Sequence, residues 1–183
     1  MFSFIETSIK DLFIIKPKIF GDDRGWFFEA YNKNDFDKNG LKYAFVQTNQ
    51  SQSKKGVLRG LHFQKRFPQA KLVRVISGEV FDVAVDLRKG SSTYGKWFGV
   101  LLSSNNKKML MIPRGFAHGF LVLSDSATFE YLCDDFYHQE DEGGIIWNDP
   151  DIDIVWPVID NIFLSEKDKN NPTLKESRME FEL

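Results

Sequence analysis

The chain has 183 residues, of which 42% are hydrophobic and 27% are charged, and its net charge at neutral pH is −2. A chain of this length buries a core of its own, and the slightly acidic balance excludes a basic surface that would attract nucleic acid. The single cysteine, Cys133, excludes an intrachain disulfide and a cysteine-based zinc site. We therefore expect one domain over residues 1–183.

The N-terminal segment, MFSFIETSIKDLFIIKPK, mixes acidic residues with apolar ones, which is not the layout of a signal peptide. No apolar run in the chain reaches the roughly 18 residues that a membrane-spanning helix needs. The sequence therefore predicts a cytoplasmic protein that has no membrane partner.

Short apolar runs, separated by turn residues, follow one another along the chain and predict about ten strands. In chain order they are LFIIKPKIF, WFFEAY, YAFVQTN, VLRGLHF, KLVRVI, EVFDVAVDL, WFGVLL, KMLMIP, GFLVL, ATFEYLC and GIIW. The polar stretch NKNDFDKNG, after the second run, predicts a short helical turn. The polar tail SEKDKNNPTLKESRMEFEL predicts loop and helix that cover one end of the sheets.

Several of these runs alternate in the manner of a strand. Over residues 80–87, the apolar residues at odd positions share one face, and Asp82 and Asp86 lie on the other. Tyr131 shares a face with its neighbours at positions 129 and 133. Together with an aromatic content of 15%, the pattern predicts an all-β fold, either a sandwich or a small barrel.

His62 lies inside one of these apolar runs, VLRGLHFQ, and three interpretations are open for it. It could be a packed core side chain, a metal ligand or a proton-transfer group. On a strand, His62 shares its face with Gly60 and Gln64, whereas Leu61 and Phe63 point the other way. Small and polar neighbours are typical of a strand that faces a ligand.

The metal interpretation requires further ligands. PRGFAH, which ends at His118, matches the P-x-G-x-x-H stretch of the second cupin motif. The first cupin motif normally supplies an H-x-H pair and a following Glu, whereas this chain offers only His62, with Gln64 in place of the second His. Two imidazoles without a carboxylate in register make a poor transition-metal site. We expect no metal, and a metal-dependent cupin enzyme is the weaker alternative that a chelator would test.

Charged and titratable residues fall in or beside the apolar strands. A buried cation needs a partner, and a cavity that holds several cations favours a polyanion such as a diphosphate. The residues concerned are Arg59, Lys71, Arg74, His118, Tyr131 and Glu142.

An ordered set of motifs spans nearly the whole chain: PKIFGDDRGWFFEAYN, VQTNQSQSKKGVLRGLHFQ, KLVRVISGEVFDVAVDLRKGSSTYGKW, IPRGFAHGFLVLS, WNDPDIDIVWP and LSEKD. With this set the chain closely resembles the dTDP-4-dehydrorhamnose 3,5-epimerase family. The resemblance implies a cupin-type jelly-roll barrel with short helical segments at the C-terminus. It also implies an enzyme of dTDP-L-rhamnose synthesis that uses no cofactor.

The family's substrate, dTDP-4-dehydro-6-deoxy-D-glucose, has a ketone at carbon 4, so the protons on carbons 3 and 5 are acidic. Removal of either proton gives an enolate, and reprotonation from the opposite face inverts the carbon, which leads to dTDP-4-dehydro-L-rhamnose. By resemblance, His62 is the base and Asp168 orients it. Tyr131 is the acid on the opposite face, and Lys71 stabilises the enolate oxygen.

The resemblance also implies a set of residues that bind the nucleotide sugar. Arg24, Phe27 and Glu29 would reach the site of the neighbouring subunit, so the protein would be an obligate homodimer with shared active sites. Within one chain, Tyr137 would stack on the thymine and Arg59 would contact the diphosphate. The other implied contacts are Gln47, Thr48, Asn49, His118, Glu142 and Lys167.

Two alternatives to double epimerisation stay open. One is a single-carbon 3-epimerase or a 3,4-ketoisomerase that acts on another nucleotide-linked 4-keto sugar. The other is a non-catalytic module that binds a sugar nucleotide, which would bind tightly without proton exchange and would not need Tyr131.

Overall fold

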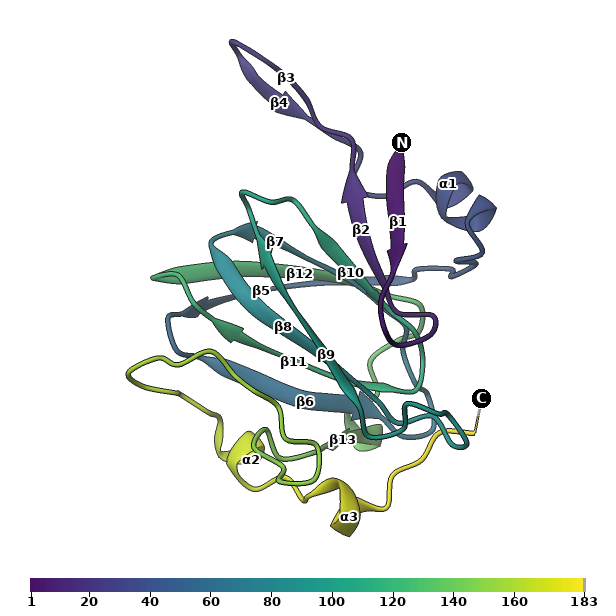
Figure 1. Cartoon of the computed structure of the whole chain (residues 1–183), viewed down its shortest axis with the longest axis vertical. Coiled ribbons are helices and arrows are strands. Elements are labelled where there is room, and N and C mark those ends of the chain that lie inside the picture. Colours follow the sequence, from purple (N-terminus) through teal and green to yellow (C-terminus); the bar gives the residue numbers. More distant parts are fainter. Residues whose placement is uncertain (183) are drawn as a thin grey trace.

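The computed structural model describes residues 1–182, which form two facing sheets and one projecting hairpin (Figure 1). Leu183, the last residue of the predicted domain and tail, lies outside the described residues. The strands are β1 Phe2–Glu6, β2 Phe13–Pro17, β3 Phe20–Asp22, β4 Gly25–Phe27, β5 Gln47–Lys54, β6 Leu58–Gln64, β7 Lys71–Ser77, β8 Glu79–Asp86, β9 Trp97–Ser103, β10 Met109–Ile112, β11 Phe116–Val122, β12 Ser126–Cys133 and β13 Glu142–Gly144. The helices are α1 Lys33–Lys38, α2 Glu166–Lys169 and α3 Leu174–Ser177, with a short 3-10 turn at Gln139–Asp141.

The larger sheet has the strand order β1-β2-β10-β7-β12-β5, and the smaller has the order β13-β6-β11-β8-β9. Every neighbouring pair is antiparallel. The all-β class and the short C-terminal helices are therefore confirmed. The two sheets do not close into a barrel, because no strand of one sheet pairs with an edge strand of the other within the described residues.

The alternation predicted for β8 decides which side chains enter the space between the sheets. Val80 and Ala84 belong to the core between the two sheets, whereas Val83 and Val85 pack on the outer face of the smaller sheet. Asp82, in phase with Val80, is therefore carried inward and is fully buried. Strand β8 is buried on both faces, as is typical of a strand with a long apolar run.

The C-terminal tail covers the outer face of the smaller sheet, whereas the sequence had predicted that it would cover an end. Leu174 of α3 and Phe181 pack with Leu61 and Phe63 of β6 in one apolar cluster. Phe181 meets the Phe63 ring edge-on, with the ring centroids 5.8 Å apart. This packing brings α2 to the edge of the sheet beside β6, as Figure 1 shows.

The predicted helical turn is α1, and it covers the outer face of the larger sheet. Its N-cap residue, Asn32, accepts hydrogen bonds from the backbone N–H groups of residues 34 and 35. Phe36, fully buried, packs against Ile15 of β2 and Leu72 of β7. Both outer faces are thus covered over part of their area, and the space between the sheets is left for the site.

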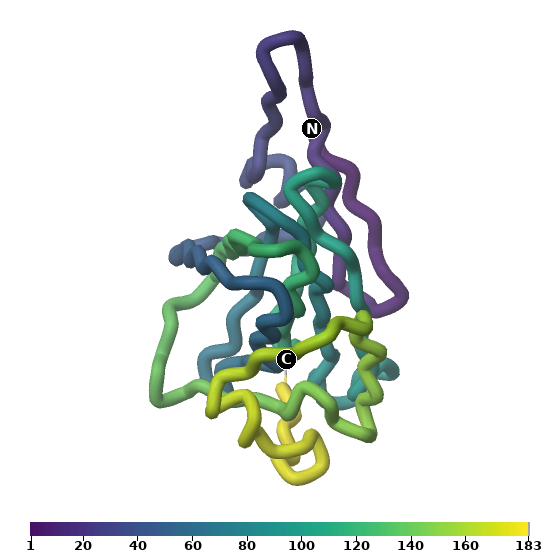
Figure 2. The backbone as a smooth tube through the Cα atoms, turned by 90° about the vertical axis from the view of Figure 1, so that its left-hand side faces the viewer, coloured from purple at the N-terminus to yellow at the C-terminus, as the bar shows by residue number. Residues whose placement is uncertain are grey.

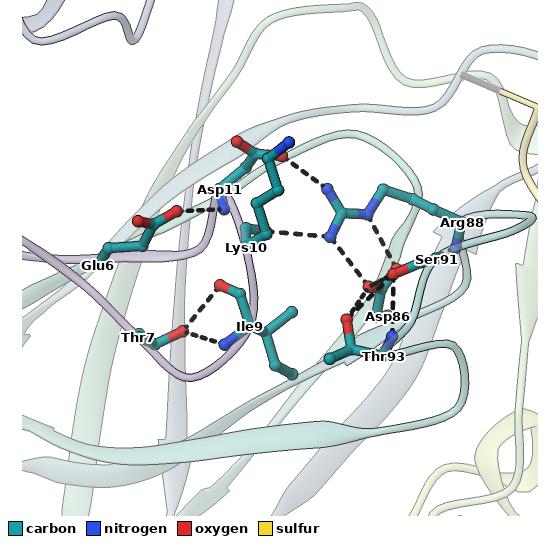
Figure 3. A network of polar contacts seen from close by, with 9 residues as sticks. All are labelled: Glu6, Thr7, Ile9, Lys10, Asp11, Asp86, Arg88, Ser91 and Thr93. Atoms are coloured by element: carbon teal, nitrogen blue, oxygen red, sulfur yellow. Dashed lines mark hydrogen bonds and ion pairs between the residues drawn. The ribbon is translucent and has the colours of Figure 1, made fainter.

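A polar network fastens the β1–β2 loop to the end of β8 (Figure 3). The guanidinium of Arg88 donates to both carboxylate oxygens of Asp86 and to Asp11, at 2.9 Å each. The hydroxyl groups of Ser91 and Thr93 donate to the same Asp86 oxygen, at 2.7 Å each. Since Asp86 is fully buried, these bonds replace the water that its charge has lost.

The hairpin of β3 and β4 extends away from both sheets, as the two perpendicular views show (Figures 1 and 2). Its turn is the GDDRG stretch, in which Gly25 has a φ of +137° and Arg24 pairs with Asp22 at 2.5 Å. Trp26 and Phe27 are 61% and 63% exposed. No helix within residues 1–182 is long and apolar enough to cross a bilayer.

Candidate active site

A cavity of about 420 Å³ opens between the two sheets. Side chains of β5, β7 and β12 form one wall and those of β6 and β11 form the other, with the segment after β12 at the rim. The lining residues are Gln47, Asn49, Ser51, Arg59, His62, Phe63, Gln64, Gln69, Lys71, His118, Gly119, Phe120, Phe129, Tyr131, Tyr137 and Glu142.

Two glycines allow β6 and β11 to approach closely beside the cavity. A Cβ atom on Gly60 would lie 2.6 Å from the Cα of Gly119, and one on Gly119 would lie 2.7 Å from the backbone oxygen of Arg59. Gly60 also has a φ of +124°, which L residues rarely adopt. The register that results pairs His62 with His118 across the two strands.

His62 forms a hydrogen bond through Nε2 with Oδ1 of Asp168, at 2.5 Å. Asp168 lies on α2, and its backbone N–H donates to the hydroxyl of the N-cap residue Ser165. Burial, the largest single effect, raises the pKa of Asp168, but the contacts with His62, Ser165 and Lys167 together outweigh burial and lower the pKa. An ionised carboxylate only accepts, so the proton lies on Nε2 and the Nδ1 lone pair of His62 is left as a base.

Tyr131 and Lys71 reach the cavity from the larger sheet, opposite the strand that carries His62. The Nζ atom of Lys71 lies 5.8 Å from the centroid of the Tyr131 ring. Burial raises the pKa of Tyr131, which keeps its phenol protonated and able to donate. Burial lowers the pKa of Lys71, and no ion pair of its ammonium is present among residues 1–182. The site therefore holds a base on one sheet and two proton donors on the other.

A second histidine–aspartate pair includes His118, a lining residue of the same cavity. His118 is bonded through Nε2 to Oδ2 of Asp82, at 2.9 Å, and both residues are buried. The other oxygen of Asp82 has no hydrogen-bond partner among residues 1–182. Sequence reasoning missed Asp82 as part of the site. The available signal was a carboxylate in phase with the inward face of an apolar strand.

The two histidines do not form a metal site with other residues of the described chain. Each already uses Nε2 to bond a separate carboxylate, Asp168 for His62 and Asp82 for His118. Across residues 1–182, no group of three or more His, Cys, Asp and Glu side chains is arranged to hold a metal ion.

Tyr137 stands at the rim of the cavity with half of its surface exposed. Its hydroxyl donates to Glu142 at 3.2 Å, and its backbone N–H donates to Oε1 of Gln47 at 3.0 Å. Glu142 also forms an ion pair with Lys167 of α2. Burial, the largest single effect, raises the pKa of Glu142, but the contacts with Lys167, His62 and Tyr137 together lower it, so the carboxylate is ionised at neutral pH.

The comparison with known proteins is consistent across sequence and structure. The family model described as dTDP-4-dehydrorhamnose 3,5-epimerase matches residues 6–176. The enzymes of that name from Methanothermobacter thermautotrophicus and Escherichia coli are 54% and 53% identical over 178 and 174 residues, which cover 96% and 94% of this chain and the same shares of theirs. The chain belongs to the dTDP-4-dehydrorhamnose 3,5-epimerase family.

A solved 3,5-epimerase from Legionella pneumophila, in complex with dTDP-4-keto-L-rhamnose, shares this fold with a TM-score of 0.95. It is 48% identical to the chain, and the match covers 98% of both. The family assignment therefore agrees with the cupin-like fold as well as with the motifs.

In this epimerase, most of the predicted site residues gather around the one cavity. Nine line it, and two more, Asp168 and Lys167, bond to lining residues from α2. The nine are Gln47, Asn49, Arg59, His62, Lys71, His118, Tyr131, Tyr137 and Glu142. Their placement agrees with the expected roles, which stay predictions.

Five expected residues lie elsewhere. Thr48 points to the exposed face of β5, since side chains alternate along a strand. Arg74 also points outward, where it pairs with Glu130 at 2.6 Å, so the expectation that it helps to line a cationic cavity is wrong. The other three, Arg24, Phe27 and Glu29, lie on or beside the projecting hairpin, away from the cavity of their own chain (Figure 1).

Proposed function

We propose that the protein inverts carbons 3 and 5 of dTDP-4-dehydro-6-deoxy-D-glucose to give dTDP-4-dehydro-L-rhamnose. The observation that carries the proposal is the opposition of a carboxylate-bonded histidine and a protonated tyrosine across one cavity. Inversion needs a base on one face of the sugar ring and an acid on the other. Family membership supports the same reaction.

The reaction begins when Nδ1 of His62 takes the proton from carbon 3 or carbon 5. The electron pair of the broken C–H bond forms a C=C bond with carbon 4, and the ketone oxygen becomes an enolate. The imidazolium that results lies 2.5 Å from the ionised carboxylate of Asp168, which stabilises its positive charge. Positioned groups of this kind accelerate proton transfer by about 10²- to 10⁴-fold.

Lys71 stabilises the enolate oxygen, because its half-buried side chain lines the cavity from the larger sheet. Tyr131 then donates its phenolic proton to the carbon from the face opposite His62, and the C=O bond forms again. The tyrosinate regains a proton from solvent and the imidazolium loses one, so each carbon is inverted without net change in the enzyme.

The nucleotide half of the substrate would lie toward the rim. Stacking of an aromatic side chain on a base contributes about 1–3 kcal/mol, and the half-exposed ring of Tyr137 is available for the thymine. The guanidinium of Arg59, which donates to Ser53 through Nε at 3.1 Å, keeps further N–H groups for the diphosphate.

We further propose a homodimer in which each chain is one domain with an N-terminal segment that completes the partner's site. Trp26 and Phe27, which stay 61% and 63% exposed on a hairpin that projects from both sheets, support this arrangement. In such a dimer, Arg24, Phe27 and Glu29 would reach the cavity of the partner subunit, since they lie away from the cavity of their own chain.

Subunit complementation tests the shared site. Arg24→Ala and His62→Ala proteins, each inactive alone, are mixed after dissociation and allowed to reassociate. Random pairing gives mixed dimers with one complete site, and thus about a quarter of the wild-type activity. Activity that does not return, although mixed dimers form, would contradict a site shared between subunits.

The reaction itself is tested with the purified protein and dTDP-4-keto-6-deoxyglucose, by NMR of the sugar product. The proposal expects inversion of both carbons. A product inverted at carbon 3 alone would replace it with a 3-epimerase, and a shifted ketone would replace it with a ketoisomerase. Tight binding without any product would indicate a binding module.

A further inference from the structure

Gln64 is a lining residue to which neither the family motifs nor the proposed chemistry gives a task. It lies at the end of β6, two positions after His62 and on the same face, and is only 4% exposed. A buried amide must place its donors and its acceptor on specific partners, because each unpaired group costs free energy. The partners of Gln64 therefore reveal what it holds.

The Gln64 amide bonds to three backbone groups of two separate loops. Its Nε2 donates to the backbone oxygens of Phe67, at 2.7 Å, and Phe136, at 3.1 Å. Its Oε1 accepts from the backbone N–H of His138, at 2.6 Å. The two bonded residues of the second loop, Phe136 and His138, are the immediate neighbours of Tyr137.

Gln64 thus clamps the backbone on both sides of the ring that is proposed to stack on thymine. A second amide, Gln47, accepts from the backbone N–H of Tyr137 itself. The rings of Phe67 and His138 stack with their centroids 4.4 Å apart, which joins the two clamped loops through their side chains as well. The loop is held through its backbone, and the Tyr137 ring projects from it, half exposed, at the rim of the cavity.

The chemistry of the clamp requires an amide. A glutamine side chain offers two N–H donors and a carbonyl acceptor, and all three functions are used here. A neutral imidazole offers one donor and one acceptor, so a histidine at this position would leave a buried backbone group unpaired. A carboxylate accepts only and would face two carbonyl oxygens.

We propose that Gln64 is a positioning residue that presets the Tyr137 ring for the nucleotide. The inference rests on the proposed function, in which Tyr137 stacks on the thymine. Gln64 and His62 lie on the same strand. The clamp therefore also fixes the distance between the rim of the cavity and the catalytic base, His62. Loss of the clamp should weaken nucleotide binding and leave the proton-transfer groups in place.

Titration calorimetry with dTDP tests the proposal. We expect Gln64→Met to raise the Kd for dTDP about tenfold or more, which corresponds to about 1.4 kcal/mol. KM should rise by the same factor. The kcat should stay within about threefold of the wild-type value, because the substitution weakens the binding of substrate and of transition state equally. Gln64→Glu and Gln64→His, which keep part of the hydrogen bonding and more of the shape, should each raise Kd too.

A double-mutant cycle separates positioning from a general structural effect. In a Tyr137→Ala background, Gln64→Met should change the Kd by less than about twofold, because the ring that it positions is gone. Gln52→Met is the matched control, since Gln52 is exposed on the outward face of β5, and it should leave Kd and KM unchanged.

Three results would overturn the proposal. The first is an unchanged Kd in folded Gln64 variants, and the second is an equal loss of affinity with and without Tyr137. The third is a fall in kcat with Kd unchanged, which would show that Gln64 positions His62 and not Tyr137. Failure of the proposed function is distinct from all three, since the unmodified protein would then give no product, or a different product, in the NMR assay.

Discussion

The hydrogen bond between His62 and Asp168 gives the sharpest quantitative expectation, and Asp168→Asn probes it with little change of shape. The carboxylate is 4% exposed at its side chain and lies 2.5 Å from Nε2 of His62. Asparagine keeps the volume and one acceptor oxygen but removes the negative charge. The imidazolium formed during proton abstraction then loses the counter-charge to which it is hydrogen-bonded.

The size of the effect follows from the kind of bond that is lost. A hydrogen bond to a charged group contributes about 1.5–3 kcal/mol, whereas a neutral one contributes about 1 kcal/mol or less. Each 1.36 kcal/mol lost from transition-state stabilisation slows a reaction about tenfold. If the whole of the charged contribution is lost, we expect kcat of Asp168→Asn to fall by about 10- to 150-fold, with little change in KM.

The assay is product formation at saturating substrate, at a pH near neutrality where wild-type Asp168 is ionised. Asp149→Asn is the matched control, because Asp149 is also buried and accepts backbone N–H groups, including that of Leu174, but does not line the cavity. It should lose stability and keep kcat. An Asp168→Asn protein with unchanged kcat would refute the assignment of His62 and Asp168 as a catalytic pair.

Two further predictions concern stability and reactivity. Burial would raise the pKa of Asp86, but bonds from Arg88, Thr93 and Ser91 lower it below 3.8, so its stabilisation is complete above that pH and is lost as the pH falls further (Figure 3). Asp86→Asn should therefore lower Tm most at pH 7. The difference in Tm between the wild type and the variant should narrow below pH 4 in thermal unfolding, and a difference that does not change with pH would contradict this. Burial raises the pKa of the Cys133 thiol to about 11, so iodoacetamide at pH 8 should modify it only in denaturant, and rapid alkylation of the folded protein would contradict its burial.

Local patterns in the sequence were sufficient for most of the strands and for the alternation of side chains along them, but not for β1 or for the bounds of β5. The alternation around Tyr131 placed its phenol beside Phe129, and both line the cavity. The polar stretch before Phe36 gave α1, since Asn32 is a favoured N-cap residue. Such features depend on neighbours in the chain and can be read from it directly.

Long-range pairings were not accessible in the same way. The bond between His62 and Asp168 joins residues 106 positions apart, and only the family resemblance brought them together. The pair of His118 and Asp82 depends on strand register in the smaller sheet, which alternation alone does not determine. The same reason explains why the open edges of the two sheets could not be predicted, because closure depends on which edges meet.

Gln64 is an instructive case between these two. Its position in a cupin-like motif indicated that a metal ligand had been replaced. The motif therefore argued against a metal-binding role for Gln64 but gave it no other role. Its three backbone bonds reach loops at positions 67 and 136–138, so the sequence nearby could not reveal them.

The most direct test of the central claim is deuterium incorporation from D₂O into dTDP-4-keto-6-deoxyglucose, measured by NMR and mass spectrometry for the unmodified protein and His62→Ala. The account predicts deuterium at carbons 3 and 5 with the unmodified protein. It predicts none at either carbon with His62→Ala, although that variant still binds dTDP. Deuterium at both carbons with the variant would contradict the assignment of His62 as the base.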